Sequence, residues 1–399
     1  MDSLPLLQPG RQASPPVTGW PLLRLGFRPF YLGAAGFAAL AIPLWVAAWL
    51  GVITLPPVVN PLLWHGHEML FGFAAAVILG FLLTAGKLWT GLATPRGPLL
   101  ALLAVCWLLA RITALTGPYP VYAVLDLMLL PVVAAIFLSL IIRSRNWRNL
   151  PLAIILSLLA LTNTGFHLSV AGFIDVAAVR TLYAALALIV LVECVIAGRV
   201  IPAFTMNATP GLRIATPPTM ERVTLLLTAI ALGAWVLAAP AVFTAAALAL
   251  AALLHLLRQW RWHPRSTFGR PVLWILHAAY AWLAIGMALL AAAQLGWISA
   301  SAGIHALAVG ATAGLIIGMM TRTARGHTGR PINVTGIETT AYALIMLAAV
   351  LRVFVPLAAP PWMTSALIGA ALAWTLAFAL YLARYTPWLC TTRLDGRDG

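Results

Sequence analysis

The sequence predicts an all-α polytopic membrane protein, a bundle of about twelve transmembrane helices, and three observations support this fold class. Of the 399 residues, 62% are hydrophobic and only 8% are charged, and the mean hydropathy is +0.98. A soluble domain carries about 25% charged residues, because water covers its surface. The apolar runs are ~20 residues long and rich in Leu and Ala, which is the length a helix needs to cross a bilayer. A barrel would instead show ~10-residue stretches of alternating polarity.

The expected helices lie between the Pro, Gly and charged residues that interrupt the apolar runs. The seventh and eighth are the hardest to separate, because only Ala239-Pro240 lies between them. The Pro-rich, polar residues 1–29 are not typical of a cleavable signal peptide and predict a cytoplasmic segment. Residues 30–385 are expected to form one helical domain, and residues 386–399 a cytoplasmic tail. The expected spans are 30–51, 64–85, 98–117, 120–143, 150–172, 180–201, 221–239, 241–260, 271–296, 303–323, 337–357 and 362–385.

The basic residues predict the orientation and exclude one class of partner. With a cytoplasmic N-terminus, all but Arg111, Arg180 and Arg352 of the 24 Lys and Arg residues fall in cytoplasmic segments. This bias favours an even number of spans and a cytoplasmic C-terminus. The net charge of +15 does not indicate a nucleic-acid partner, since the basic residues lie singly or in small groups between apolar spans. The three cysteines are far apart and form no CxxC pair, so neither a disulfide framework nor a cysteine metal site is expected.

Four histidines from three expected helices map to one depth, near the periplasmic face: His65, His67, His167 and His305. Ionisable groups inside a bilayer are costly and tend to line functional sites. Neutral imidazole is the commonest metal ligand and also binds haem iron axially. Because no single helix carries an HxxH or HxxxH pair, ligands are expected from separate helices, for example on the two faces of a planar macrocycle. The alternative is a set of interfacial side chains hydrogen-bonded to their neighbours.

The other four histidines map toward the cytoplasm. His277 lies early in the ninth expected helix and His327 just beyond the tenth. His255 and His263 flank a basic loop, and we interpret both as solvated or interfacial side chains.

His65 and His67 are two residues apart, so on a helix they point ~200° away from each other. They are therefore not expected to share one metal, and His67 is interpreted as the inward one. Glu68 beside it is a candidate acid or hydrogen-bond partner of a ligand.

A ridge of small residues follows both His67 and His305. Each ridge begins five residues after the histidine and repeats at every fourth position, which lets a helix or a flat cofactor approach the backbone closely. The shared offset favours pairing of the second and tenth helices, and ordinary helix packing is the alternative. The ridge residues are Gly72, Ala76, Gly80, Gly310, Gly314 and Gly318.

Three acidic residues, Glu68, Asp126 and Glu193, fall inside apolar spans of a chain with only nine acids. Proton delivery through a membrane needs carriers of this kind. The alternative is structural pairing, of Asp126 with Arg111 and of Glu193 with Arg199.

The segments that hold these residues resemble the NnrS family. Residues 64–72 (WHGHEMLFG) are similar to its WHxHEMLFG signature, and residues 27–30 (FRPF) to its N-terminal element. Residues 198–205 (GRVIPAFT) resemble its GGRVIPFFT segment, with Ala197 in place of a Gly and Ala203 in place of a Phe. The stretches HALAVG from His305, GMMTR from residue 318 and GHTGRP from residue 326 resemble its HALTVG, GMMTR and GHTGRP block.

The resemblance covers most of the chain and implies a haem- and copper-containing protein of the nitric oxide response in the bacterial inner membrane. It implies one or two haem b groups, copper as a further metal and nitric oxide as the ligand. The electron donor is not identified by the sequence, and a quinol and a periplasmic cytochrome are the two alternatives. The arginines suit haem propionates, and positive-inside anchoring is their alternative role. The implied cofactor and metal residues are His65, His67, His167, His277, His305 and His327, with Arg28, Arg199 and Arg322 as the cationic positions.

Three classes of function compete for this chain. The first is an enzyme that reduces two nitric oxide molecules to nitrous oxide at a His-ligated haem, with Glu68, Glu193 and Asp126 conducting protons. A second haem, bound by His277 and His327 near the inner face, is an additional hypothesis. The second class is a haem or copper carrier, or a nitric oxide sensor, which needs ligands but no proton path. The third is a secondary transporter. The sequence shows no 6+6 repeat, and this absence argues against a transporter.

Overall fold

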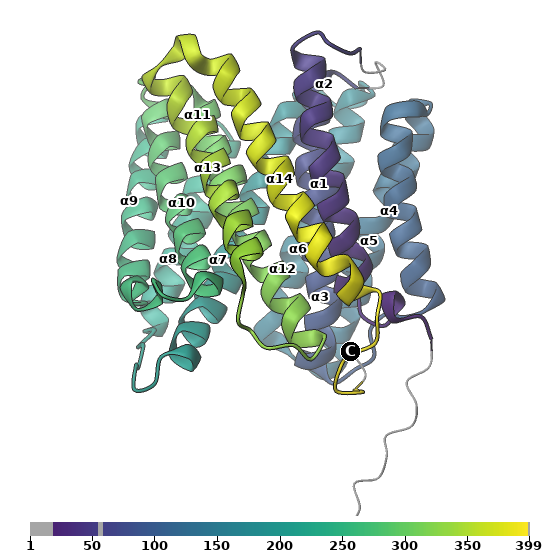
Figure 1. Ribbon diagram of the computed structural model, residues 1–399. Helices are drawn as coiled ribbons and strands as arrows, with labels where there is room; N and C mark the ends of the chain where they lie inside the picture. The colour runs from purple at the N-terminus through teal and green to yellow at the C-terminus, as the bar shows by residue number, and fades with distance from the viewer. Residues whose placement is uncertain (1–18, 55–58, 398–399) are drawn as a thin grey trace, which may run out of the picture.

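The computed structural model describes residues 19–54 and 59–397, and all regular structure within these ranges is helical (Figure 1). The predicted cytoplasmic segment 1–29 lies largely outside the described residues. Twelve helical spans of the described chain are long and apolar enough to cross a membrane, which confirms the fold class and the number of spans. The helices are α1 (Phe27–Trp49), α2 (Pro61–His67), α3 (Ala75–Thr90), α4 (Pro98–Thr116), α5 (Tyr119–Ser144), α6 (Leu150–Val170), α7 (Ala178–Ala208), α8 (Pro218–Val236), α9 (Ala241–Trp260), α10 (Pro271–Gln294), α11 (Ala300–His305), α12 (Gly314–His327), α13 (Gly336–Ala358) and α14 (Met363–Leu389).

Two of the twelve spans are built from three pieces. The π-helical segment Glu68–Ala74 joins α2 to α3, and a second π-helical segment, Ala306–Ala313, joins α11 to α12. Other boundaries follow the expected signals: the break between α8 and α9 falls at residues 237–240, and α3 ends where Gly91 adopts a left-handed conformation with φ of 70°.

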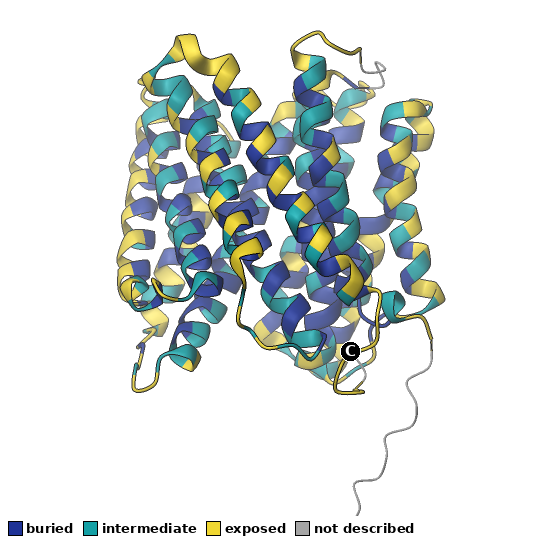
Figure 2. Cartoon of the chain, viewed as in Figure 1, coloured by how far each residue is buried: buried dark blue, intermediate teal, exposed yellow. Residues whose placement is uncertain are grey.

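The two composite spans lie in the centre of the bundle. In their most apolar stretches, 83% of the residues of Pro61–Thr90 and 72% of those of Ala300–His327 are buried, against 33% for α4 and for α8. Large apolar side chains such as Leu102 and Leu226 are exposed on the peripheral helices, as a lipid-facing surface requires. Figure 2 shows exposed positions along outer helices such as α4. The two spans that carry His65, His67 and His305 are thus shielded from lipid by their neighbours.

The two ridges of small residues do not pack against each other. A Cβ added at Gly80 would lie 2.9 Å from Phe30 of α1, and one at Gly314 would lie 2.6 Å from Ala279 of α10. The ridges therefore let α1 and α10 approach closely, which is the helix-packing alternative, and they do not bring the second and tenth spans into contact. These two spans meet instead across a cavity.

Candidate functional site

The four histidines predicted at one depth converge, but in two separate groups. The imidazole rings of His65 and His305 are nearly parallel, with an interplanar angle of 11° and centroids 6.5 Å apart. The rings of His67 and His167 have centroids 5.4 Å apart. His65 and His67 point in different directions, as predicted. His67 is fully buried, yet the residue that faces His305 is His65.

His65 and His305 both line a cavity of about 500 Å³, together with residues of α1, α2, α7, α11, α13 and α14. Its lining is chiefly apolar, and the polar exceptions include the two imidazoles, Ser301 and Arg352. Sites for small molecules and cofactors typically measure about 300–1,000 Å³ and combine an apolar wall with a few polar groups. The cavity has the size and chemistry of such a site.

The two imidazoles are held in different ways. Nδ1–H of His305 donates to the Ser301 carbonyl at 2.8 Å, which fixes the tautomer because a carbonyl can only accept. Arg352 donates to Oγ of the same serine at 3.1 Å. His65 instead stacks on Trp45, with ring centroids 4.1 Å apart and an interplanar angle of 20°. Its buried Nδ1 has no hydrogen-bond partner among the described residues.

Both histidine-bearing spans become π-helical directly after a histidine. The first π-helical segment begins one residue after His67, and the second begins one residue after His305. Such segments are rare and occur often at functional sites, because an extra residue in the turn redirects the side chains around it. Thr312 of the second segment lines the His65–His305 cavity.

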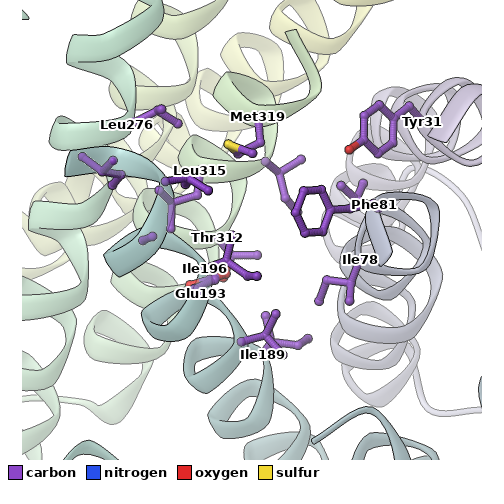
Figure 3. Close-up of a pocket in the computed structure, with 16 residues that line it drawn as sticks. Tyr31, Ile78, Phe81, Ile189, Glu193, Ile196, Leu276, Thr312, Leu315 and Met319 are labelled. Carbon is purple, nitrogen blue, oxygen red and sulfur yellow. The ribbon is translucent and has the colours of Figure 1, made fainter. Parts of the chain in front are cut away.

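A smaller pocket of about 80 Å³ adjoins this cavity, and Thr312 lines both (Figure 3). Glu193 of α7 lies in the pocket beside Thr312, and the Glu193 Oε2 atom is buried without a hydrogen-bond partner among the described residues. Its suggested partner Arg199 donates to Asn149 at 2.6 Å instead. Tyr31 lines the same pocket from α1. Glu193 therefore places a carboxyl group next to the His65–His305 cavity, with one oxygen that no described residue binds.

The second group of histidines belongs to a buried ionic network. Arg111 donates to Glu68 at 2.6 Å and also to Asp126, so the predicted pairing of Asp126 with Arg111 is confirmed. Nε2 of His167 lies 3.1 Å from Oδ2 of Asp126, and Nε2 of His67 lies 3.3 Å from the same oxygen. All five side chains are buried. Two carboxylates face one guanidinium, so with neutral imidazoles the network lacks one positive charge, which is costly in a low dielectric.

His67, Asp126 and His167 could together hold a metal ion, since one ligand atom from each lies within 4.8 Å of the others. In a tetrahedral site with bonds of about 2.0–2.1 Å, neighbouring ligand atoms are roughly 3.3 Å apart, close to the two distances to Asp126 Oδ2. The other ring nitrogens have acceptors, because Nδ1 of His67 is 3.2 Å from Glu68 and Nδ1 of His167 is 3.0 Å from the Tyr119 hydroxyl. Metal-binding histidines characteristically make this outer hydrogen bond.

The two histidines proposed for a second haem, His277 and His327, lie in different surroundings. Nε2 of His277 is 3.0 Å from the Thr205 hydroxyl, and His277 lines a pocket of about 440 Å³ that His327 does not line. The His327 ring, at the end of α12, packs against Phe27 with centroids 5.5 Å apart. The contacts of these two residues give no support to a haem that they share.

The interpretation of His255 as a solvated or interfacial side chain is wrong, because His255 is fully buried. Its Nδ1 lies 2.6 Å from the Tyr280 hydroxyl and its Nε2 2.9 Å from the Thr228 hydroxyl. The helical register of α9 turns this residue toward α8 and α10, although it lies near the end of the helix. His263, in the following loop, is exposed as expected.

The three predicted cationic positions do not line the His65–His305 cavity. Arg28 donates to two backbone carbonyls at the end of α14, at 2.7 and 2.9 Å. The Arg322 guanidinium lies 3.6 Å from the centroid of a phenylalanine ring of α7, and Arg199 bonds to the loop before α6. The cation that does line the cavity is Arg352. As an arginine inside an apolar span it carried a signal that the sequence reasoning left unused.

The fold and these sites define a polytopic helical membrane protein with intramembrane histidine centres. The family model described as NnrS protein matches residues 21–393, so the chain belongs to the NnrS family. A comparison with curated proteins gave no match.

Proposed function

We propose that this protein binds haem b in the cavity between His65 and His305 and uses it to remove nitric oxide. The observation that carries the proposal is the relation between the two rings. Imidazoles that bind one metal from opposite sides through bonds of about 2.0 Å have centroids roughly 6.3 Å apart, and the centroids of His65 and His305 are 6.5 Å apart. The apolar wall suits a macrocycle, and Arg352 suits a propionate.

Nitric oxide as the substrate rests on membership of the NnrS family, which is linked to the nitric oxide response. The molecule is small and uncharged, so an apolar cavity admits it without a desolvation cost. In the proposed reaction two nitric oxide molecules take up two electrons and two protons and give nitrous oxide and water. Bound haem supplies the redox centre, and a quinol or a periplasmic cytochrome supplies the electrons.

The protons of this reaction must reach an apolar cavity, and Glu193 is placed to deliver them. Its carboxyl group lies in the adjoining pocket, beside the Thr312 residue that both spaces share (Figure 3). Glu68 and Asp126 are less suited to this role, because each is bonded to Arg111. A carboxylate held by a guanidinium gives and takes protons less readily.

A second candidate function is copper binding without turnover, as in a carrier or sensor. The observation that favours it is the convergence of His67, His167 and Asp126, since imidazole and carboxylate ligands suit copper as well as zinc. This metal site and the haem site are compatible, because they use different residues.

The absorption spectrum of the full chain, purified in detergent, tests the proposal. We expect a Soret band typical of two imidazole ligands that shifts when nitric oxide is added. A double His65→Ala, His305→Ala variant should lose haem, and a His263→Ala variant should keep it, because His263 is exposed in a loop. A wild-type protein without haem would contradict the proposal. Nitric oxide consumption and nitrous oxide release with a chemical reductant then separate turnover from sensing.

A further inference from the structure

The two histidines of the cavity are unequally supported. We propose that His305 is the permanent axial ligand and that His65 is the exchangeable one, whose place nitric oxide takes. This inference rests on the proposed haem site and adds the direction from which nitric oxide binds.

His305 has the support that a permanent ligand needs. Its Nδ1–H donates to the Ser301 carbonyl at 2.8 Å, so Nε2 keeps the lone pair that binds a metal. A hydrogen bond to the outer nitrogen orients the ring and raises the basicity of the ligand, and its loss typically weakens metal binding about 10–100-fold. Ser301 is itself held, because its Oγ accepts a hydrogen bond from Arg352 at 3.1 Å.

His65 lacks that support. Its buried Nδ1 has no hydrogen-bond partner among the described residues. The ring is positioned by its stacking on Trp45, whose face opposes the imidazole at a centroid distance of 4.1 Å. A stacked ring can slide or tilt without breaking a hydrogen bond, so moving it costs less than moving His305.

The proposed ligand exchange needs no further reactant, because one neutral ligand replaces another. The bond from His65 to the metal breaks, the neutral imidazole keeps its lone pair, and nitric oxide forms the new bond on the same side. The same cavity is lined by the flexible and apolar side chains of Leu62 and Met69, so a displaced His65 ring would move among apolar groups. His305 keeps the cofactor attached throughout.

The single variants His65→Ala and His305→Ala test this asymmetry, with His263→Ala as the matched control. The His65→Ala variant should keep haem at close to the wild-type ratio, with a five-coordinate, high-spin spectrum that added imidazole returns to low spin. The haem content of the His305→Ala variant should be lower than that of the wild type by a factor of about ten or more. The control variant should match the wild type.

Electron paramagnetic resonance of the reduced protein with nitric oxide gives a second readout, which does not depend on the folding of His305→Ala. The wild type and His65→Ala should give the same nitrosyl spectrum, with coupling to one imidazole nitrogen opposite the nitric oxide. Loss of haem from His65→Ala with retention in His305→Ala, equal loss from both, or a wild-type spectrum that His65→Ala fails to reproduce would each overturn the inference. Absence of haem from the wild type would overturn the proposed function instead.

Discussion

The carboxyl group of Glu193 lies beside Thr312, and this contact joins the two spaces in the centre of the bundle. Thr312 belongs to the π-helical segment that begins after His305. The proposed haem ligand and the proposed proton donor are therefore connected through one short stretch of helix.

Replacement of Glu193 by Gln should abolish most nitric oxide consumption and leave the haem spectrum unchanged. A positioned acid contributes about 10²–10⁴-fold to a rate, so we expect the reduction rate to fall at least about a hundredfold. The measurement is anaerobic nitric oxide consumption with a nitric oxide electrode. The control is Asp175→Asn, which changes an exposed acid in a loop. Wild-type rates in the Glu193→Gln variant would exclude this residue as the donor.

Replacement of Arg352 by Ala should weaken haem binding by about 10–150-fold, because a charge-assisted hydrogen bond to a propionate is worth about 1.5–3 kcal/mol. Titration of the haem-free protein with haem measures the affinity. Arg352→Lys should recover part of the loss, and Arg143→Ala, an exposed arginine of α5, should have no effect. An unchanged affinity in Arg352→Ala would place the propionates elsewhere.

The variants His167→Ala and Asp126→Asn should lose any metal bound in the network and keep haem. Each removes one of three ligand atoms that lie within 4.8 Å of one another. Elemental analysis of protein loaded with copper measures the metal, and the Soret band reports on the other site. His263→Ala serves as the control. Equal copper content in wild type and both variants would rule out a site at these residues.

Replacement of Arg111 by Leu should destabilise the protein strongly, because it leaves the carboxylates of Glu68 and Asp126 buried without their cation. Removing one partner of a buried pair costs about 3–5 kcal/mol. Thermal unfolding in detergent should show a clear fall in midpoint. The further changes Glu68→Gln and Asp126→Asn should restore part of it, since they remove the charges. A single variant as stable as the wild type would show that the network is not what holds α4 and α5 in place.

Replacement of His255 by Ala should lower stability without altering the haem spectrum. The substitution removes the hydrogen bonds of His255 to the Tyr280 and Thr228 hydroxyls, and one such bond contributes about 0.5–1.5 kcal/mol to stability. Both hydroxyls keep another partner, since Tyr280 accepts from Arg258 and Thr228 donates to the Thr224 carbonyl. The matched change His263→Ala should leave the unfolding midpoint unchanged. A shifted Soret band in His255→Ala would instead connect this residue with the cofactor.

The two groups of histidines show which contacts the sequence alone predicts and which it does not. Helical geometry alone separated His65 from His67, because residues two apart point to different sides. It could not tell which of the two meets His305, since that depends on how the second span is rotated against its neighbours. The register of α9 likewise decided that His255 is buried.

The sequence by itself determined that the chain crosses a membrane about twelve times, since apolar runs of bilayer length leave the backbone no alternative to helix. It also identified the polar residues inside apolar spans, which are costly in a bilayer and therefore indicate a functional or a paired group. Only the tertiary structure decided the partnerships: His65 with His305, His67 with His167 and Asp126, and Arg352 with the cavity. The physical reason is that hydropathy depends on each segment alone, whereas the rotation and tilt of a helix depend on packing between side chains far apart in the chain.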